Sequence, residues 1–178
     1  MNKKQLTAIR RIVSNGKSNN PDSTVGYGGY FDRETGKVTF TDGFSLVMFD
    51  DVCIEKDYLD VFKSEDSYNW HKDMDLNANQ LFYTFNNDFH SMYDDSMSKN
   101  YSQKDINDAH KTMKESKDVN ERWCMTNEFG TCYDIRLMRN VIESMGEKNV
   151  TVYFPKEHKP IVVCGISSMG LVMPVKSQ

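Results

Sequence analysis

The C-terminal part of the chain switches from a helical to a strand-like pattern of apolar positions. Met138, Ile142 and Met145 recur at the spacing of one helix face. Gly146 follows where a C-cap glycine belongs, which predicts a helix over residues 134–146. The segments NVTVYF, IVVCGI and GLVMPV come next and are rich in strand-forming residues, with turn residues between them. This pattern predicts a helix packed on a three-stranded meander.

The N-terminal part repeats the same order of elements. Leu6, Ile9, Ile12 and Val13 form the apolar face of a helix that we predict over residues 3–14. The segments GYGGYFD, KVTFTD and FSLVMFD follow, separated by Glu-Thr-Gly and Asp-Gly turns, and predict a second meander. We therefore predict an α+β fold in one domain, residues 1–178, with two helix-plus-β-meander units at about 1–49 and 122–178.

An acidic segment, about 50–121, separates the two units. It carries 17 acidic and 8 basic side chains, a net charge of −9, whereas the rest of the chain has 9 acidic and 14 basic, a net of +5. The stretch from Ser102 predicts a helix, because Ser102 and Asp105 have capping-box spacing. Residues 93–101 are polar and acidic, and we expect a loop there. We interpret 50–121 as a partly helical insertion that avoids DNA and meets a basic protein surface or the chain's own basic helices.

Length and composition indicate a single soluble domain. The chain of 178 residues is 38% hydrophobic and has no apolar run long enough to cross a membrane. Its basic, amphipathic start lacks the features of a secretory signal, so we predict a cytoplasmic protein without a membrane partner. Cys53, Cys124, Cys132 and Cys164 are scattered without a C-x-x-C pair, which indicates reduced thiols.

Catalytic and metal-binding patterns are absent from the sequence. The four histidines, His71, His90, His110 and His158, do not share an element at ligand spacing. There is also no P-loop, H-E-x-x-H or G-x-S-x-G motif. Asp73 and Asp75 could contact Mg²⁺, but short acidic runs are more often a solvated surface. We predict a protein that is not an enzyme and has no cofactor and no metal site.

Two segments resemble the bacterial DNA polymerase III β sliding clamp family. Clamp chains typically end in a strand that runs into Met-Pro-Met-Arg-Leu, and LVMPVK at residues 171–176 stands in that place. The family also has a strand followed by Thr-Asp-Gly, an aromatic or His, and Arg-Leu. Here TDGF occupies residues 41–44, and Ser45 replaces the usual Arg. The resemblance covers the two repeat units, 106 of 178 residues.

The resemblance implies two sites. In sliding clamps the helices line a ring and face DNA, so basic residues on outward helix faces are expected to contact the phosphate backbone without reading bases. These expected DNA contacts are Lys3, Lys4, Arg10, Arg11, Arg136 and Arg139. Glu143 and Glu147 dilute the basic character of the second helix, and the simpler interpretation is that Lys and Arg solubilise exposed helices. The family's peptide-binding pocket uses the C-terminal segment, which assigns peptide binding to Met173, Pro174 and Val175.

Two functions from different classes follow. The first is a processivity-type accessory protein that associates with DNA and with an enzyme such as a polymerase or nuclease. Because clamp chains carry several such domains in series, a chain with one domain would have to form a homo-oligomer to close a ring. The alternative is a phage or mobile-element protein that inhibits a host nucleic-acid enzyme, such as a CRISPR-Cas nuclease or the replisome. Basic helices favour the first function, whereas small size and an acidic insertion that could mimic DNA favour the second.

Overall fold

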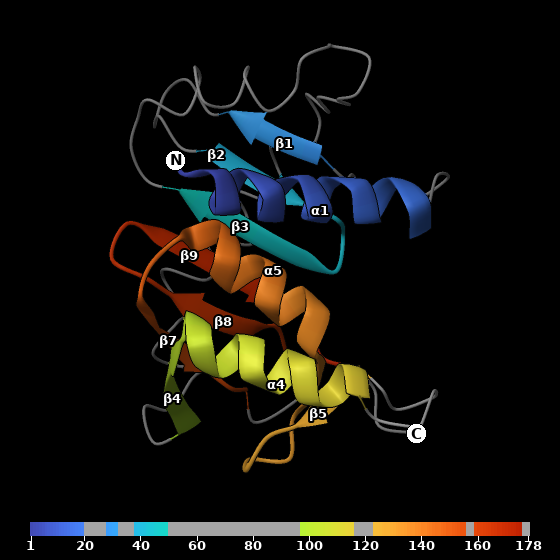
Figure 1. The fold of residues 1–178 in the computed structure, drawn as a ribbon, viewed down its shortest axis with the longest axis vertical. Helices are drawn as coiled ribbons and strands as arrows, with labels where there is room; N and C mark the ends of the chain where they lie inside the picture. Colours follow the sequence, from blue (N-terminus) through green and yellow to red (C-terminus); the bar gives the residue numbers. More distant parts are fainter. Residues whose placement is uncertain (20–27, 32–37, 50–96, 116–122, 156–158, 176–178) are drawn as a thin grey trace.

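The computed structural model describes residues 1–19, 28–31, 38–49, 97–115, 123–155 and 159–175. The elements in these ranges are α1 Lys3–Asn19, β1 Gly28–Phe31, β2 Val38–Thr41, β3 Ser45–Phe49, β4 Ser98–Ser102, α4 Gln103–Glu115, β5 Cys124–Thr126, β6 Cys132–Asp134, α5 Ile135–Met145, β7 Asn149–Tyr153, β8 Ile161–Cys164 and β9 Ser168–Val172 (Figure 1). No helix in these ranges has both the length and the apolar character that crossing a membrane requires.

The described strands form a seven-stranded antiparallel sheet in the order β1-β2-β3-β9-β8-β7-β4, beside a small β5-β6 sheet. The order β1-β2-β3 is mirrored by β7-β8-β9, and the two meanders join where β3 pairs with β9, from Ser45↔Val172 to Phe49↔Ser168. Helices α1 and α5 pack side by side on one face of the sheet, as an approximate two-fold axis between β3 and β9 would place them (Figure 1). The predicted fold, two helix-plus-meander repeats, is confirmed.

The N-terminal helix is longer than predicted. It begins after Asn2, whose side-chain Oδ1 accepts hydrogen bonds from the backbone N–H groups of Lys4 and Gln5, both at 3.0 Å. It continues to Asn19, past the predicted end at residue 14. The longer helix contains Gly16. A glycine in a helix interior costs only about 1 kcal/mol relative to alanine, and tertiary packing can offset that cost. The buried side chains of Ile9 and Ile12 supply such packing.

Helix α5 is fixed at both ends. The Asp134 side chain accepts a hydrogen bond from the Arg136 backbone N–H at 2.8 Å, and Gly146 closes the helix in the left-handed conformation, with φ of 71°. The side chain of Gln5 donates to the carbonyl of Met145 at 3.1 Å, so the start of α1 caps the end of α5. The positive φ at Gly146, which L side chains rarely adopt, explains why a glycine occupies this position.

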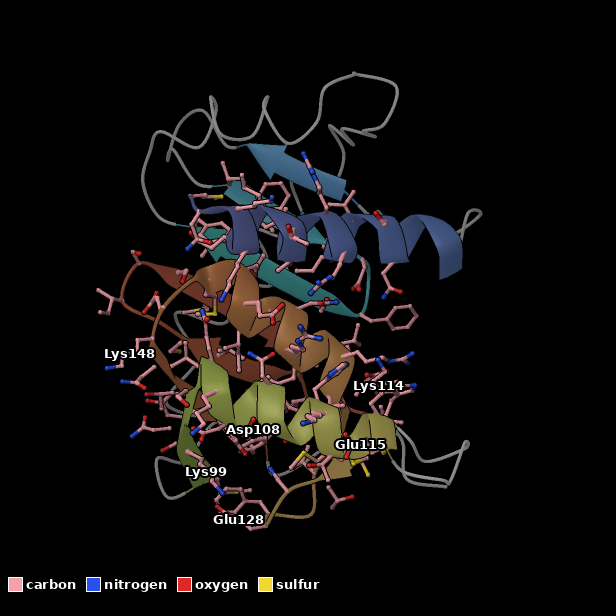
Figure 2. All side chains as sticks on the ribbon, viewed as in Figure 1. Lys99, Asp108, Lys114, Glu115, Glu128 and Lys148 are labelled. Atoms are coloured by element: carbon pink, nitrogen blue, oxygen red, sulfur yellow. The ribbon has the colours of Figure 1, made fainter. Side chains whose placement is uncertain are left out.

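Part of the predicted insertion belongs to the sheet and the core. β4 pairs with β7, so the prediction of a loop over residues 93–101 is wrong for 98–101; residues 93–96 lie outside the described ranges. The predicted capping box of α4 is confirmed, because Ser102 N–H donates to the Asp105 carboxylate at 2.9 Å and Asp105 N–H donates to Ser102 Oγ at 3.2 Å. Figure 2 shows Lys99 and Glu128, which form a 3.1 Å ion pair, at this edge of the sheet. The boundaries of the insertion stay a prediction, since 50–96 and 116–121 are not described.

The main core lies between the helices and the sheet. Each helix sends one apolar face into it, including Ile9 from α1, Ile106 from α4 and Ile142 from α5. Alternate residues of β3 face opposite sides, so that Val47 joins this core while Leu46 joins a smaller cluster on the other face of the sheet. Helix α5 packs closely on β9, because Gly170 has no side chain and leaves room for Val141. This packing fixes the middle of α5 against β9.

Candidate functional site

A cleft of about 820 Å³ opens where four parts of the chain meet. These parts are the C-terminal half of α1, the first turns of α5, the β2–β3 turn and residues 173–175; the side chain of His110 adds a contribution from α4. One wall of the cleft is apolar and includes Phe44, Met173 and Val175. Three arginines, Arg11, Arg136 and Arg139, also line the cleft. We call these the apolar wall and the basic wall.

The apolar wall exposes large side chains that the core does not use. Phe44 is 46% exposed, Met173 is 42% exposed and Val175 is 40% exposed. In the part of the chain that the structure describes, the other exposed large hydrophobic side chains are Met1 and Ile166. Exposed apolar residues that gather in a concave site, rather than scatter over the surface, mark a place where another molecule binds.

Backbone hydrogen bonds hold the C-terminal segment in place. The N–H of Met173 donates to the carbonyl of Phe44 at 2.8 Å, and the N–H of Val175 donates to the carbonyl of Cys132 at 2.9 Å. Pro174, between them, has no N–H to satisfy and forms a bridge to Tyr133. Because side chains alternate along an extended segment, Met173 and Val175 project to the same side. The Met-Pro-Val sequence therefore builds a fixed apolar rim.

The β2–β3 turn presents Phe44 in a fixed position. The buried carboxylate of Asp42 accepts hydrogen bonds from the Phe44 N–H at 2.9 Å, from Ser45 Oγ at 3.0 Å and, through its other oxygen, from the Asn15 side chain at 2.9 Å. Gly43 adopts φ of 86°, which a side chain would disfavour. Ser45, where the clamp family has Arg, thus supports the turn. The Thr-Asp-Gly turn therefore closes the β2–β3 hairpin and also holds Phe44 in the lining of the cleft.

Glu143 forms ion pairs with two arginines of the basic wall. One carboxylate oxygen accepts from Arg11 Nη1 and the other from Arg139 Nε, each at 2.9 Å. Arg139 Nε also donates to the Asn107 side chain at 2.9 Å. The Glu143 side chain is only 15% exposed, so it positions the two guanidinium groups while contributing little surface. Two arginines that share one carboxylate retain a net charge of +1.

Arg136 takes part in a stack of side chains that includes Trp123 and His110. Its guanidinium bonds to the Asp134 carboxylate at 2.6 Å and lies 5.0 Å from the centre of the Trp123 ring. Trp123 in turn stacks on His110, with ring centres 5.2 Å apart. The bond to Asp134 raises the pKa of Arg136. Burial and the nearby positive charge of Arg139 lower the pKa of His110, so this histidine is neutral near pH 7.

This stack makes folding sensitive to pH. In the unfolded chain a histidine has a pKa near 6.5, and in the folded protein the pKa of His110 lies lower. Between these two values the unfolded state binds more protons, so the free energy of unfolding falls as the pH falls through this window; above about pH 6.5 the effect vanishes. Lowering the pH from 7.5 to 5.5 should therefore lower the melting temperature. The drop should be smaller in His110→Phe, which keeps an aromatic ring beside Trp123. An equal drop in both proteins would contradict this account.

The structure brings part of the two predicted sites together. Arg11, Arg136 and Arg139, predicted as DNA contacts, line the same cleft as Met173, Pro174 and Val175, predicted as peptide contacts. Lys3 and Lys4 are exposed at the start of α1 and lie outside the cleft lining, and Arg10 is exposed on α1. Neither predicted role is tested by these positions.

The sequence did not indicate Phe44 or His110 as site residues. Phe44 carried a signal that could have been used, because an aromatic residue directly after an Asp-Gly turn is often exposed at the turn. His110 reaches the cleft only through the packing of α4 on α5. Among the described residues, no group of three or more His, Cys, Asp or Glu side chains is placed to hold a metal ion.

Solved structures of bacterial sliding clamps share this fold. The DNA polymerase III β subunit of Thermotoga maritima superposes with a TM-score of 0.57 at 6% sequence identity, over 97% of this chain and 63% of its own. The corresponding subunit of Borrelia burgdorferi, solved in complex with a natural product, gives 0.55 at 11% identity, over 98% and 62%. The DNA polymerase sliding clamp of Pseudomonas aeruginosa gives 0.51 at 10% identity, over 97% and 65%.

These likenesses establish a clamp-like fold and nothing finer. The chain spans less than two thirds of the length of these structures, and the identities are 11% or lower. No model of a known protein family matches the sequence, and no curated protein does.

Proposed function

We propose that this chain is a non-enzymatic, sliding-clamp-like module that holds a short segment of a nucleic-acid enzyme, such as a polymerase or nuclease, in the cleft. The observation that carries the proposal is the position of the Met-Pro-Val segment, which forms the apolar rim of a concave site on a clamp-like fold. The predicted peptide contacts, Met173, Pro174 and Val175, keep their role, and Phe44 is added to them. We propose that the protein acts in the cytoplasm, as the sequence predicts.

The two walls define the chemistry of the segment. The apolar wall accepts two neighbouring apolar side chains, and burying each of them stabilises the complex by roughly 1.5–3 kcal/mol. The basic wall favours an acidic side chain, because Arg11 and Arg139 keep a surplus positive charge and N–H groups that Glu143 does not use. A partly exposed ion pair contributes only about 0.2–1 kcal/mol. The apolar pair therefore supplies most of the affinity, and the acidic residue sets the register.

A titration with labelled synthetic peptides tests this proposal. The reference peptide carries an aspartate followed closely by a Leu-Phe pair, and fluorescence anisotropy reports its binding to the full chain. Replacing the Leu-Phe pair by alanines should weaken binding more than tenfold, because more than about 1.4 kcal/mol of apolar burial is lost. Replacing the aspartate by lysine should weaken it roughly three- to tenfold. Equal binding of all three peptides, or no binding of the reference peptide, would contradict the proposal.

The helix layer is proposed to meet the DNA backbone without reading bases. Lys3, Lys4 and Arg10 are exposed on α1, and among the described residues the ammonium groups of Lys3 and Lys4 form no ion pair that a phosphate contact would have to replace. Arg11, Arg136 and Arg139 would have to share their guanidinium groups between DNA and the carboxylates that already hold them. Lys3 and Lys4 therefore become the strongest DNA candidates of the six.

Closure around DNA would require several copies of the chain. In the described sheet, β1 and β4 are the two edge strands. Edge strands present unpaired backbone groups that can join another sheet, so a homo-oligomer could form by pairing β1 of one copy with β4 of the next. This assembly is part of the same proposal.

One observation favours the alternative function. The three arginines of the cleft are each bonded to a carboxylate, which reduces the positive charge available to DNA and leaves a site suited to protein. Under this alternative, the chain is a phage or mobile-element protein that uses the cleft or its acidic segment to inhibit a host nucleic-acid enzyme, such as a CRISPR-Cas nuclease or the replisome. If the unaltered protein does not bind DNA at low salt, the alternative function is favoured over the first.

A further inference from the structure

Two cysteines meet on the small β5-β6 sheet. Cys124 lies on β5 and Cys132 on β6, and their Sγ atoms are 3.1 Å apart. In the register of the two strands Cys132 is opposite Thr126 and Cys124 is opposite Asp134, so the two thiols are diagonal neighbours across the hairpin. A disulfide bond needs the sulfurs at about 2.05 Å. The two sulfurs are therefore about 1 Å from bonding distance in the paired hairpin.

The surroundings of this pair differ from those of the other described cysteine. All three described cysteines are half-buried, so small reagents can approach each of them, but only the pair has a second thiol close by; Thr126 Oγ1 also lies 2.9 Å from the Sγ of Cys132. Burial raises the pKa of the Cys164 thiol to about 11, which keeps it protonated and poorly reactive. Cys164 lies on β8 in the main sheet and provides an internal control.

We propose that Cys124 and Cys132 form a reversible dithiol–disulfide site that reacts with low-molecular-weight disulfides such as oxidised glutathione. One cysteine loses its proton and attacks a glutathione sulfur; a mixed disulfide forms and one glutathione leaves as a thiolate. The second cysteine then loses its proton and attacks the first cysteine's sulfur, forming the internal disulfide and releasing the second glutathione. The two protons lost by the cysteines are matched by those taken up by the two glutathione thiolates. The cysteines are oxidised by two electrons and glutathione is reduced by two.

A backbone hydrogen bond connects this site to the cleft. The carbonyl of Cys132 accepts the N–H of Val175, which belongs to the apolar wall. A disulfide would hold β6 against β5 and so suppress the local opening that exposes this N–H to water. Oxidation should then slow the hydrogen exchange of the Val175 amide several-fold.

Mass spectrometry tests the proposal directly. Trypsin cleaves after Arg122 and Arg136, so residues 123–136 form one peptide that contains both cysteines and no other. The full chain is treated with oxidised glutathione, remaining thiols are alkylated, and the protein is digested. The expected peptide is unalkylated and two hydrogens lighter than the reduced form, and dithiothreitol should restore it.

Three variants separate this site from general oxidation. Cys164→Ser should still form the internal disulfide, whereas Cys124→Ser and Cys132→Ser should not, and their remaining cysteine should carry glutathione. After oxidation, the slower exchange at Val175 should appear in the unaltered protein and in Cys164→Ser. It should not appear in Cys124→Ser or Cys132→Ser. Full alkylation of both cysteines after treatment, or a lasting mixed disulfide in the unaltered protein, would overturn the proposal. An internal disulfide without any change at Val175 would overturn its link to the cleft.

Discussion

The double variant Phe44→Ala, Met173→Ala is expected to bind the acidic–apolar peptide about 30-fold more weakly than the unaltered chain. Both side chains are a little under half exposed in the unbound protein, so each has roughly half its apolar surface left to bury on binding. This burial amounts to about 1 kcal/mol for each residue, or about 2 kcal/mol together. Such a loss corresponds to roughly a 30-fold change in the dissociation constant. Fluorescence anisotropy with the reference peptide measures it.

A matched control separates loss of the cleft from a general loss of surface apolarity. Ile166 is 97% exposed and lies in the β8–β9 turn, outside the cleft lining. Ile166→Ala should leave peptide affinity within about twofold, because a surface substitution away from the site has a small effect. The melting temperature of the double variant should stay close to that of the unaltered chain, since neither side chain belongs to the core. Unchanged affinity in a folded double variant would show that the peptide binds elsewhere.

The second large effect concerns DNA. Lys3→Glu combined with Lys4→Glu should weaken binding to duplexes of unrelated sequence by roughly 100-fold near 50 mM salt, because two phosphate contacts and their counterion release are lost. The slope of log K against log salt should become shallower by about 1.8, or about 0.9 for each contact. The helix itself should tolerate the change, since glutamates near a helix N-terminus interact favourably with its dipole. Anisotropy titrations of labelled duplexes at several salt concentrations measure both quantities.

A control with the same change in net charge is available away from α1 and α5. Lys99 lies on the edge strand β4, and Lys159 is exposed just before β8. Replacing both by glutamate should weaken DNA binding far less than the change at Lys3 and Lys4. Equal losses in the two double variants, when gel filtration shows that the Lys99, Lys159 variant keeps the oligomeric state of the unaltered chain, would mean that only overall charge matters, and the proposed DNA face would be wrong.

The repeated unit could be predicted because its signals are local. Met138, Ile142 and Met145 mark one helix face, and Gly146 marks its end, as the structure confirms. The strand β4 could not be predicted in the same way. Its sequence, SKNYS, is polar, and it becomes a strand because the edge of β7 supplies pairing partners such as Val150 for Tyr101. Pairing between segments about fifty residues apart leaves no periodic signal in either one.

The cleft was only partly predictable for a related reason. The resemblance of the Met-Pro-Val end to clamp chains pointed to the apolar rim, whereas no local pattern joined it to Phe44. The pairing of Arg139 with Glu143 follows from i,i+4 spacing on one helix, but the pairing of Arg11 with Glu143 depends on α1 packing beside α5. The sequence therefore predicted outward-facing arginines, and only the fold shows that they share a wall.

Hydrogen exchange of the full chain with and without the acidic–apolar peptide tests the central claim most directly. The claim is that the cleft between the C-terminal segment and the first turns of α5 holds a protein segment. It predicts that saturating peptide slows exchange in three places: the β2–β3 turn around Phe44, the first turns of α5, and residues 173–175. The reference peptide with its apolar pair replaced by alanine should leave all three unchanged. Protection confined to other parts of the chain, with these three regions unaffected, would contradict the claim.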